Sequence, residues 1–160
     1  MVRPDPAAEV VAALTARGQL LATAESLTGG LLGAAITAVP GASAAYVGGV
    51  VAYATPMKHR LAGVDTELLA TQGPVSERTA MALAAGVRDA TGADWAVATT
   101  GVAGPTAQDG HEPGEVWVGI VGPGVAVRAV RHDFTGDRAE VRAATVQAAL
   151  ALLAGALAAD

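Results

Sequence analysis

The sequence contains no cysteine, which excludes disulfide bonds, thiolate nucleophiles and cysteine-ligated zinc or iron–sulfur sites. Aromatic residues make up only 3% of a chain that is 52% hydrophobic, so alanine and valine carry most of the apolar content. No apolar run reaches, uninterrupted, the ~20 residues of a membrane-spanning helix. The alanine-rich segment 145–159 comes nearest, but it follows a charged turn and is more typical of a packed terminal helix. We therefore expect no membrane partner.

Positive charge is also scarce, because the formal net charge is −5 at pH 7. An acidic domain lacks the broad positive field that nucleic-acid binding usually needs, so we expect no nucleic-acid partner. The first residues, MVRPDPAAEV, carry acids and prolines and lack the apolar core of a signal peptide. Together these features predict a cytoplasmic protein.

The length of 160 residues suits one domain covering 1–160. Strand patterns alternate with helix patterns, which indicates an α/β layered domain. The sequence predicts a hairpin across Gly122-Pro123-Gly124, which makes the sheet mixed rather than wholly parallel, and a long loop over 101–114. We expect helices at 6–17, 31–39, from 56, 76–90 and from 137, and strands at 19–24, 46–53, 95–99, 115–121 and 125–134.

The first candidate site is the turn from Glu25 to Gly30, between a predicted strand and a predicted helix. Ser26 lies at its tip, and the amides from Thr28 to Gly30 would point toward an anion placed there. The same donors could form an oxyanion hole beside a serine nucleophile. Ser26 or Thr28 could equally be a simple helix cap. We take Glu25, Thr28, Gly29 and Gly30 as candidate substrate-binding residues.

Lys58 is the only lysine in the chain, against nine arginines. Arginine stays protonated, whereas lysine can lose its proton, so a single surviving lysine suggests a role as a general base. If Thr55 caps the helix and Pro56 begins it, the helix dipole would lower the pKa of Lys58. The alternative is a solvated surface lysine. Nearby Tyr53 could position a proton or stack on a ring, or it could simply pack in its strand.

Two further segments carry polar groups that could contact a ligand. Thr100, Gly101 and Gly104 follow a predicted strand, where the threonine could donate to a ligand and the glycines would permit close approach. A plain turn explains this segment as well. Arg138 and Arg142 share a helix face and could clamp a phosphate, although they could also be surface charges on a helix capped by Asp137.

The three histidines, His59, His111 and His132, are scattered along the chain. None has the spacing of a metal site with a carboxylate partner, so we expect surface or packing histidines and no metal. No local signature supports a serine–histidine–aspartate arrangement.

Taken in order, these motifs resemble the CinA C-terminal family. The set is AES-x-TGG at 24–30, Y-x4-K at 53–58, TG-x-AGP at 100–105, G-x-VW at 114–117 and F-x-GDR at 134–138. Each motif alone is unspecific, whereas the ordered set is strong and extends from about Val10 to Leu157.

The resemblance implies a three-layer α/β/α sandwich with a mixed, mostly parallel sheet. It also implies hydrolysis of the carboxamide of nicotinamide mononucleotide to nicotinate mononucleotide and ammonia, a step of the pyridine nucleotide cycle that needs no cofactor. By resemblance Ser26 is the nucleophile, and Lys58, with Tyr53, activates it. Thr100 and either Arg138 or Arg142 would contact the ligand or the transition state. We also expect a homo-oligomer, most simply a dimer.

The chain departs from the family pattern at Thr55, where many relatives have asparagine. Threonine can still cap a helix, but a ligand contact could be lost. Longer family members carry an N-terminal domain with a pyrophosphatase activity, which is not transferred to this chain. Three alternatives stay open: an amidohydrolase acting on another small amide, a non-catalytic nucleotide-binding module, and a structural partner domain related to DNA uptake.

Overall fold

The structure is a computed structural model that describes residues 2–159. The elements follow one another as α1 (Pro6–Arg17), β1 (Leu21–Glu25), α2 (Leu31–Thr37), η1 (Ala42–Ala44), β2 (Tyr46–Val51), α3 (Thr55–Ala62), α4 (Thr66–Gln72), α5 (Glu77–Thr91), β3 (Trp95–Gly101), β4 (Glu115–Gly122), β5 (Val125–Asp133) and α6 (Arg138–Ala159).

Local sequence signals explain most helix ends. The side chain of Asp5 accepts a hydrogen bond from the amide of Ala7, and Gly18 closes α1 with a φ of 63°. Ser76 caps α5 in the same manner. These helices begin as the cap residues predict, whereas α4 was not expected. Asp65 caps α4 by accepting from the amide of Glu67, a signal that the sequence contains.

The five strands form one sheet in the order β2-β1-β3-β4-β5. β1 pairs with both β2 and β3 in parallel, and β4 is antiparallel to β3 and β5. Because β5 is antiparallel to β4, it runs in the same direction as the three parallel strands. The predicted mixed, mostly parallel sheet and its late hairpin are confirmed.

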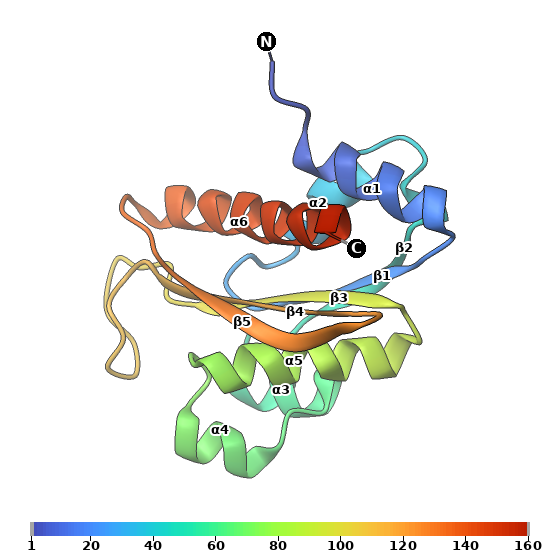
Figure 1. The fold of residues 1–160 in the computed structure, drawn as a ribbon. Coiled ribbons are helices and arrows are strands. Elements are labelled where there is room, and N and C mark those ends of the chain that lie inside the picture. The colour runs from blue at the N-terminus through green and yellow to red at the C-terminus, as the bar shows by residue number, and fades with distance from the viewer. Residues whose placement is uncertain (1, 160) are drawn as a thin grey trace.

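The sheet is the middle of three layers (Figure 1). α1, α2 and α6 cover one face, and α3, α4 and α5 cover the other. α6 is the one helix among residues 2–159 that is long and apolar enough to cross a membrane by length and composition. Seven of its side chains are nevertheless buried, and the six apolar ones pack into the core of this face.

The two faces of the sheet are packed with side chains of different size. The α1–α2–α6 face is filled largely by leucine, isoleucine, valine and Trp95. On the opposite face, β1 and β3 present alanines beneath α5. A Cβ added at Gly119 of β4 would lie 2.3 Å from the backbone oxygen of Ala80 in α5, so the helix lies very close to the sheet. The alanine-rich composition therefore permits close approach between layers.

Candidate active site

Three parallel strands end side by side and place the predicted site residues at one edge of the sheet. Glu25 of β1 pairs with Val51 of β2 and with Thr99 of β3 at the same level. The residues after this level therefore converge, as expected for the carboxyl edge of parallel strands. They border a cleft of about 570 Å³ whose lining includes the predicted residues Ser26, Tyr53, Lys58, Thr100, Gly101, Gly104 and Arg138.

Ser26 and Lys58 meet on the floor of this cleft. The Nζ atom of Lys58 lies 2.9 Å from the Oγ atom of Ser26. It also donates to the backbone oxygens of Ala52, at 2.9 Å, and Tyr53, at 3.1 Å. Ser26 is 6% exposed and Lys58 only 1% exposed. The interpretation of Lys58 as a solvated surface residue is therefore wrong.

Burial is what lowers the pKa of Lys58, from 10.5 to about 8. The sequence predicts Lys58 in the first helical turn after a Thr55 cap, with the helix dipole as the cause of the lowered pKa. In the structure the cap position is Ala54, which makes no side-chain cap bond, and Lys58 is the fourth helical residue. The direction of the shift agrees with the prediction, and its cause is corrected. Thr55 instead contributes to the lining of the cleft.

The turn after Ser26 is held by the chain's own carboxylate. Oε1 of Glu25 accepts from the amides of Gly30 and Leu32, at 3.2 and 2.9 Å, and Oε2 accepts from Gly33 at 3.0 Å. The start of α2 thus binds an anion, as its geometry predicts, but that anion is Glu25. Glu25 is buried and lies outside the cleft lining.

The remaining predicted donors of this turn are also engaged. The amide of Gly29 donates to the backbone oxygen of Ser26 at 3.1 Å. With the amide of Gly30 bound to Glu25, the predicted oxyanion hole at Gly29 and Gly30 is wrong. The hydroxyl of Thr28 is buried and lies 2.8 Å from the hydroxyl of Thr99. These residues shape the turn rather than line the cleft.

The two candidate arginines have separate positions. Arg142 donates to the backbone oxygens of Leu27 and Thr28, at 2.9 and 3.3 Å, and so stabilises the turn that follows Ser26. Arg138 lines the cleft and donates to the backbone oxygen of Gly104 at 2.8 Å and to the hydroxyl of Tyr53 at 3.2 Å. Of the two, only Arg138 faces the space in which a ligand would bind.

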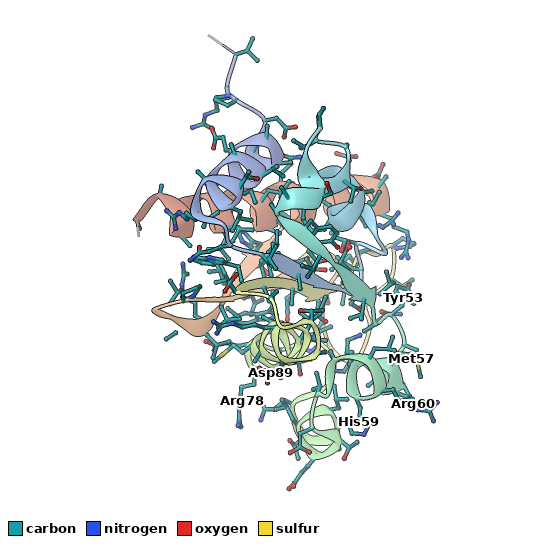
Figure 2. The ribbon with its side chains drawn as sticks, turned by 90° about the vertical axis from the view of Figure 1, so that its right-hand side faces the viewer. Tyr53, Met57, His59, Arg60, Arg78 and Asp89 are labelled. Atoms are coloured by element: carbon teal, nitrogen blue, oxygen red, sulfur yellow. The ribbon has the colours of Figure 1, made fainter. Side chains whose placement is uncertain are left out.

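Tyr53 contributes to the site in two ways. Its side chain is 60% exposed. It lies just beyond the end of β2 and next to α3, the helix that carries Met57 and Arg60 (Figure 2). Its hydroxyl contacts Arg138, whereas its backbone oxygen accepts from Lys58. Tyr53 therefore positions the lysine through the main chain and borders the cleft through its ring.

Thr100 lies in the cleft, but its hydroxyl is not available for the donation to a ligand that the sequence predicts. Its hydroxyl donates to the backbone oxygen of Pro74 at 2.5 Å. The proton expected to reach a ligand is used within the protein, so toward a ligand this oxygen can act only as an acceptor in this arrangement.

The cleft also contains residues that the motifs did not indicate. Thr106, Gln108 and Asp109, from the long loop after β3, line one side of it. The Asp109-Gly110 dipeptide was the available signal, since such a pair favours a tight hairpin turn. Among residues 2–159, no group of three or more histidine, cysteine, aspartate or glutamate side chains is arranged to hold a metal ion.

A buried serine beside a buried lysine, at the carboxyl edge of parallel strands, defines the class as an α/β domain built around a serine–lysine pair. The chain belongs to the CinA C-terminal domain family, whose model matches residues 4–157.

Relatives of known sequence and structure agree with this assignment. A CinA-like protein of Frankia casuarinae is 50% identical over 145 residues, which cover 90% of this chain and 33% of the relative. A CinA-like protein of Anaeromyxobacter is also 50% identical over 145 residues, with 90% and 35% covered. The chain thus spans about a third of the length of these curated relatives.

Two crystal structures of CinA superfamily proteins share the fold. One from Klebsiella pneumoniae has a TM-score of 0.93 at 38% identity and covers 98% of both chains. One from Escherichia coli has a TM-score of 0.90 at 31% identity, with 96% of this chain and 92% of that chain covered.

Proposed function

We propose that this protein hydrolyses the carboxamide of nicotinamide mononucleotide to nicotinate mononucleotide and ammonia, with Ser26 as nucleophile and Lys58 as general base. The observation that carries the proposal is the 2.9 Å contact between Lys58 Nζ and Ser26 Oγ in a buried site. A serine hydroxyl is a weak nucleophile until an adjacent base accepts its proton.

The surroundings of Lys58 prepare it for this role. As an ammonium ion it donates to Ser26, Ala52 and Tyr53 together. After the loss of one proton, its two remaining N–H groups can still bind the two backbone oxygens. The lone pair is then directed at the hydroxyl of Ser26, and burial favours this neutral form.

The reaction proceeds in two balanced halves. Ser26 Oγ attacks the carboxamide carbon as Lys58 takes its proton, and a tetrahedral oxyanion forms. Lys58 then returns the proton to the departing nitrogen, so that ammonia leaves and an acyl-enzyme remains. Water attacks the ester with Lys58 again as base, which releases the carboxylate and restores the serine hydroxyl.

The oxyanion requires donors other than Gly29 and Gly30. The amide of Leu27 directly follows the nucleophile, and Leu27 lines the cleft. Within residues 2–159 this amide has no hydrogen-bond acceptor. The amide after a nucleophilic serine is a common oxyanion donor in other serine hydrolases, so we assign it that role.

Arg138 is the proposed phosphate contact. Its bonds to Gly104 and Tyr53 use two of five guanidinium N–H groups, which leaves the others for an anion. This assigns the transferred arginine role to Arg138, while Arg142 supports the turn.

Ammonia release from nicotinamide mononucleotide, by wild type and by Ser26→Ala, tests the proposal. Wild type should produce ammonia and nicotinate mononucleotide in equal amounts, and Ser26→Ala should lower turnover by about 10³-fold or more. Equal rates of ammonia release from wild type and Ser26→Ala would contradict the proposal. Ammonia release from another amide, but not from nicotinamide mononucleotide, would mean that Ser26 and Lys58 act on a different substrate. Binding without release would indicate a nucleotide-binding module in which the Thr55 departure matters.

A further inference from the structure

The loop after β3 forms a small, rigid turn at the edge of the cleft. Gln108 and His111 exchange two backbone hydrogen bonds, at 3.0 and 2.8 Å. Asp109 and Gly110 between them have φ values of 50° and 79°. Two consecutive residues with positive φ are the signature of a type I′ turn, and Asp-Gly is a favoured pair for it. The turn therefore presents Asp109 in a defined position.

A chain of polar side-chain contacts connects this turn to the sheet. Nδ1 of His111 lies 2.7 Å from Oε2 of Glu115, at the start of β4. Oε1 of the same carboxylate lies 3.3 Å from Arg131 of β5. Because Glu115 is buried and held from two sides, the turn is anchored to two strands rather than free to swing.

Asp109 itself lines the cleft, and among residues 2–159 it is the only carboxylate in the lining. Within residues 2–159 its side chain makes no hydrogen bond and no ion pair. The other charged groups in the lining are Lys58 and Arg138. An unpartnered carboxylate thus borders a cleft whose two other charged residues, Lys58 and Arg138, are basic.

We propose that Asp109 is a specificity residue that recognises the positive charge of an N-substituted pyridinium ring, and so favours the nucleotide over neutral amides. This inference rests on the proposed function, because the ring charge belongs to that substrate. A cation that leaves water needs a compensating charge, and Asp109 is the only lining residue that can supply one. Free nicotinamide is neutral and would gain nothing from this carboxylate.

The competing role for the same carboxylate is a pair of hydrogen bonds to ribose hydroxyls. The cleft can satisfy hydroxyls without Asp109, because Gln108, Thr106 and Thr55 also line it. In contrast, no other lining residue among residues 2–159 carries a negative charge. The observations therefore favour recognition of the ring charge, and the ribose contact becomes an outcome of the test.

Two ligands that differ in ring charge separate these roles. Binding of nicotinamide mononucleotide and of its reduced dihydropyridine form is measured by calorimetry on Ser26→Ala, which prevents turnover. Both ligands carry the same ribose and phosphate, and only the first carries the cation. Asp109→Asn removes the charge but keeps the turn, because Asn-Gly is also a preferred type I′ pair. Asp89→Asn is the matched control, on the exposed part of α5 (Figure 2) and outside the cleft lining.

Asp109→Asn should weaken binding of the cationic ligand by about fivefold and of the reduced ligand by less than about twofold, as expected for one partly solvated charge pair. The difference should shrink at about 1 M salt, where charges are screened. Asp89→Asn should change neither affinity. Equal weakening of both ligands would overturn the ring-charge role in favour of ribose contacts, and no weakening of either would remove Asp109 from recognition. Failure of the protein with Asp109 intact to bind the cationic ligand would overturn the proposed function together with this inference.

Discussion

The floor of the cleft, formed by Ser26 and Lys58, is buried, and its polar side-chain atoms bind each other and two backbone oxygens. The rim, formed by Tyr53, Asp109 and Arg138, is exposed, and two of its three residues are charged. Burial gives the floor a lysine that can lose its proton, at the cost of dependence on close packing around it. Exposure leaves the rim free to adapt to a ligand, and each contact there is individually weak. Substitutions on the floor should therefore affect turnover or folding, whereas substitutions on the rim should affect affinity.

The largest effect is expected from Lys58→Arg. Arginine keeps the positive charge but stays protonated, so it cannot accept the proton of Ser26. Turnover should fall by about 10³-fold or more. Arg60→Lys, the reverse exchange at an exposed position of the same helix (Figure 2), should leave ammonia release unchanged. Near-normal turnover by Lys58→Arg would remove the lysine from the role of base.

The next effect concerns the packing that buries the floor. A Cβ added at Gly86 of α5 would lie 1.6 Å from the backbone oxygen of Ala62, at the end of α3. A backbone atom cannot move aside alone, so α3 and its Lys58 would have to shift. Gly86→Ala should lower the free energy of unfolding by about 3 kcal/mol and reduce turnover as well. Urea denaturation measures the first effect, and ammonia release measures the second.

Gly155→Ala is the matched control for this substitution. Gly155 lies in α6, is exposed, and a Cβ there would meet nothing within 4 Å. Replacement by alanine should raise the free energy of unfolding by roughly 0.5–1 kcal/mol, because alanine favours the helix. If both alanine variants were equally stable, the tight contact between α3 and α5 would be disproved.

The same contact illustrates what the sequence could not predict. Lys58 was identified by its rarity, by its place near a helix start and by the Y-x4-K motif, and the structure buries it beside Ser26. The cause of its lowered pKa was missed, because burial depends on how α3 packs against α5, a long-range contact. The helix dipole, in contrast, can be inferred from the local sequence. Glycines such as Gly86 give no sequence signal that distinguishes a tight contact from an open one.

The turn after β1 shows a second limit. The sequence correctly predicted a helix start that binds an anion, but local pattern cannot tell an external anion from Glu25, which comes from the preceding strand. Asp109 escaped notice for a related reason. Its place beside the cleft depends on the contact between His111 and Glu115, and on how the long loop folds back over the strand ends. Strands, caps and the hairpin were predictable because their signals are local.

A smaller effect, on affinity, is expected at the rim. Arg138→Met removes the proposed phosphate contact and should raise KM about thirtyfold with little change in kcat, the loss expected for charge-assisted hydrogen bonds. Nicotinamide riboside, which lacks the phosphate, should be insensitive to the change. Arg142→Met is the comparison, since it frees the backbone oxygens of Leu27 and Thr28 and should lower kcat and stability instead. If Arg142→Met raised KM and Arg138→Met lowered kcat instead, the roles of the two arginines would have to be exchanged.

The smallest effect is the pH dependence of wild type, and it tests the floor without any substitution. The pKa of Lys58 is about 8, and the neutral form is the base, so kcat/KM should rise with pH and level off above that value. Between about pH 7 and about pH 9 the rise should be about tenfold, a range in which the substrate phosphate, with its pKa near 6, stays at least about nine-tenths ionised. A circular dichroism signal constant over this range is the control for folding. A lysine with an ordinary pKa of 10.5 would instead give a value of kcat/KM that still rises about tenfold per pH unit at pH 9. A profile that is flat over this range would mean that the base is another group. The position of the plateau therefore measures directly how far burial has prepared the lysine to accept a proton.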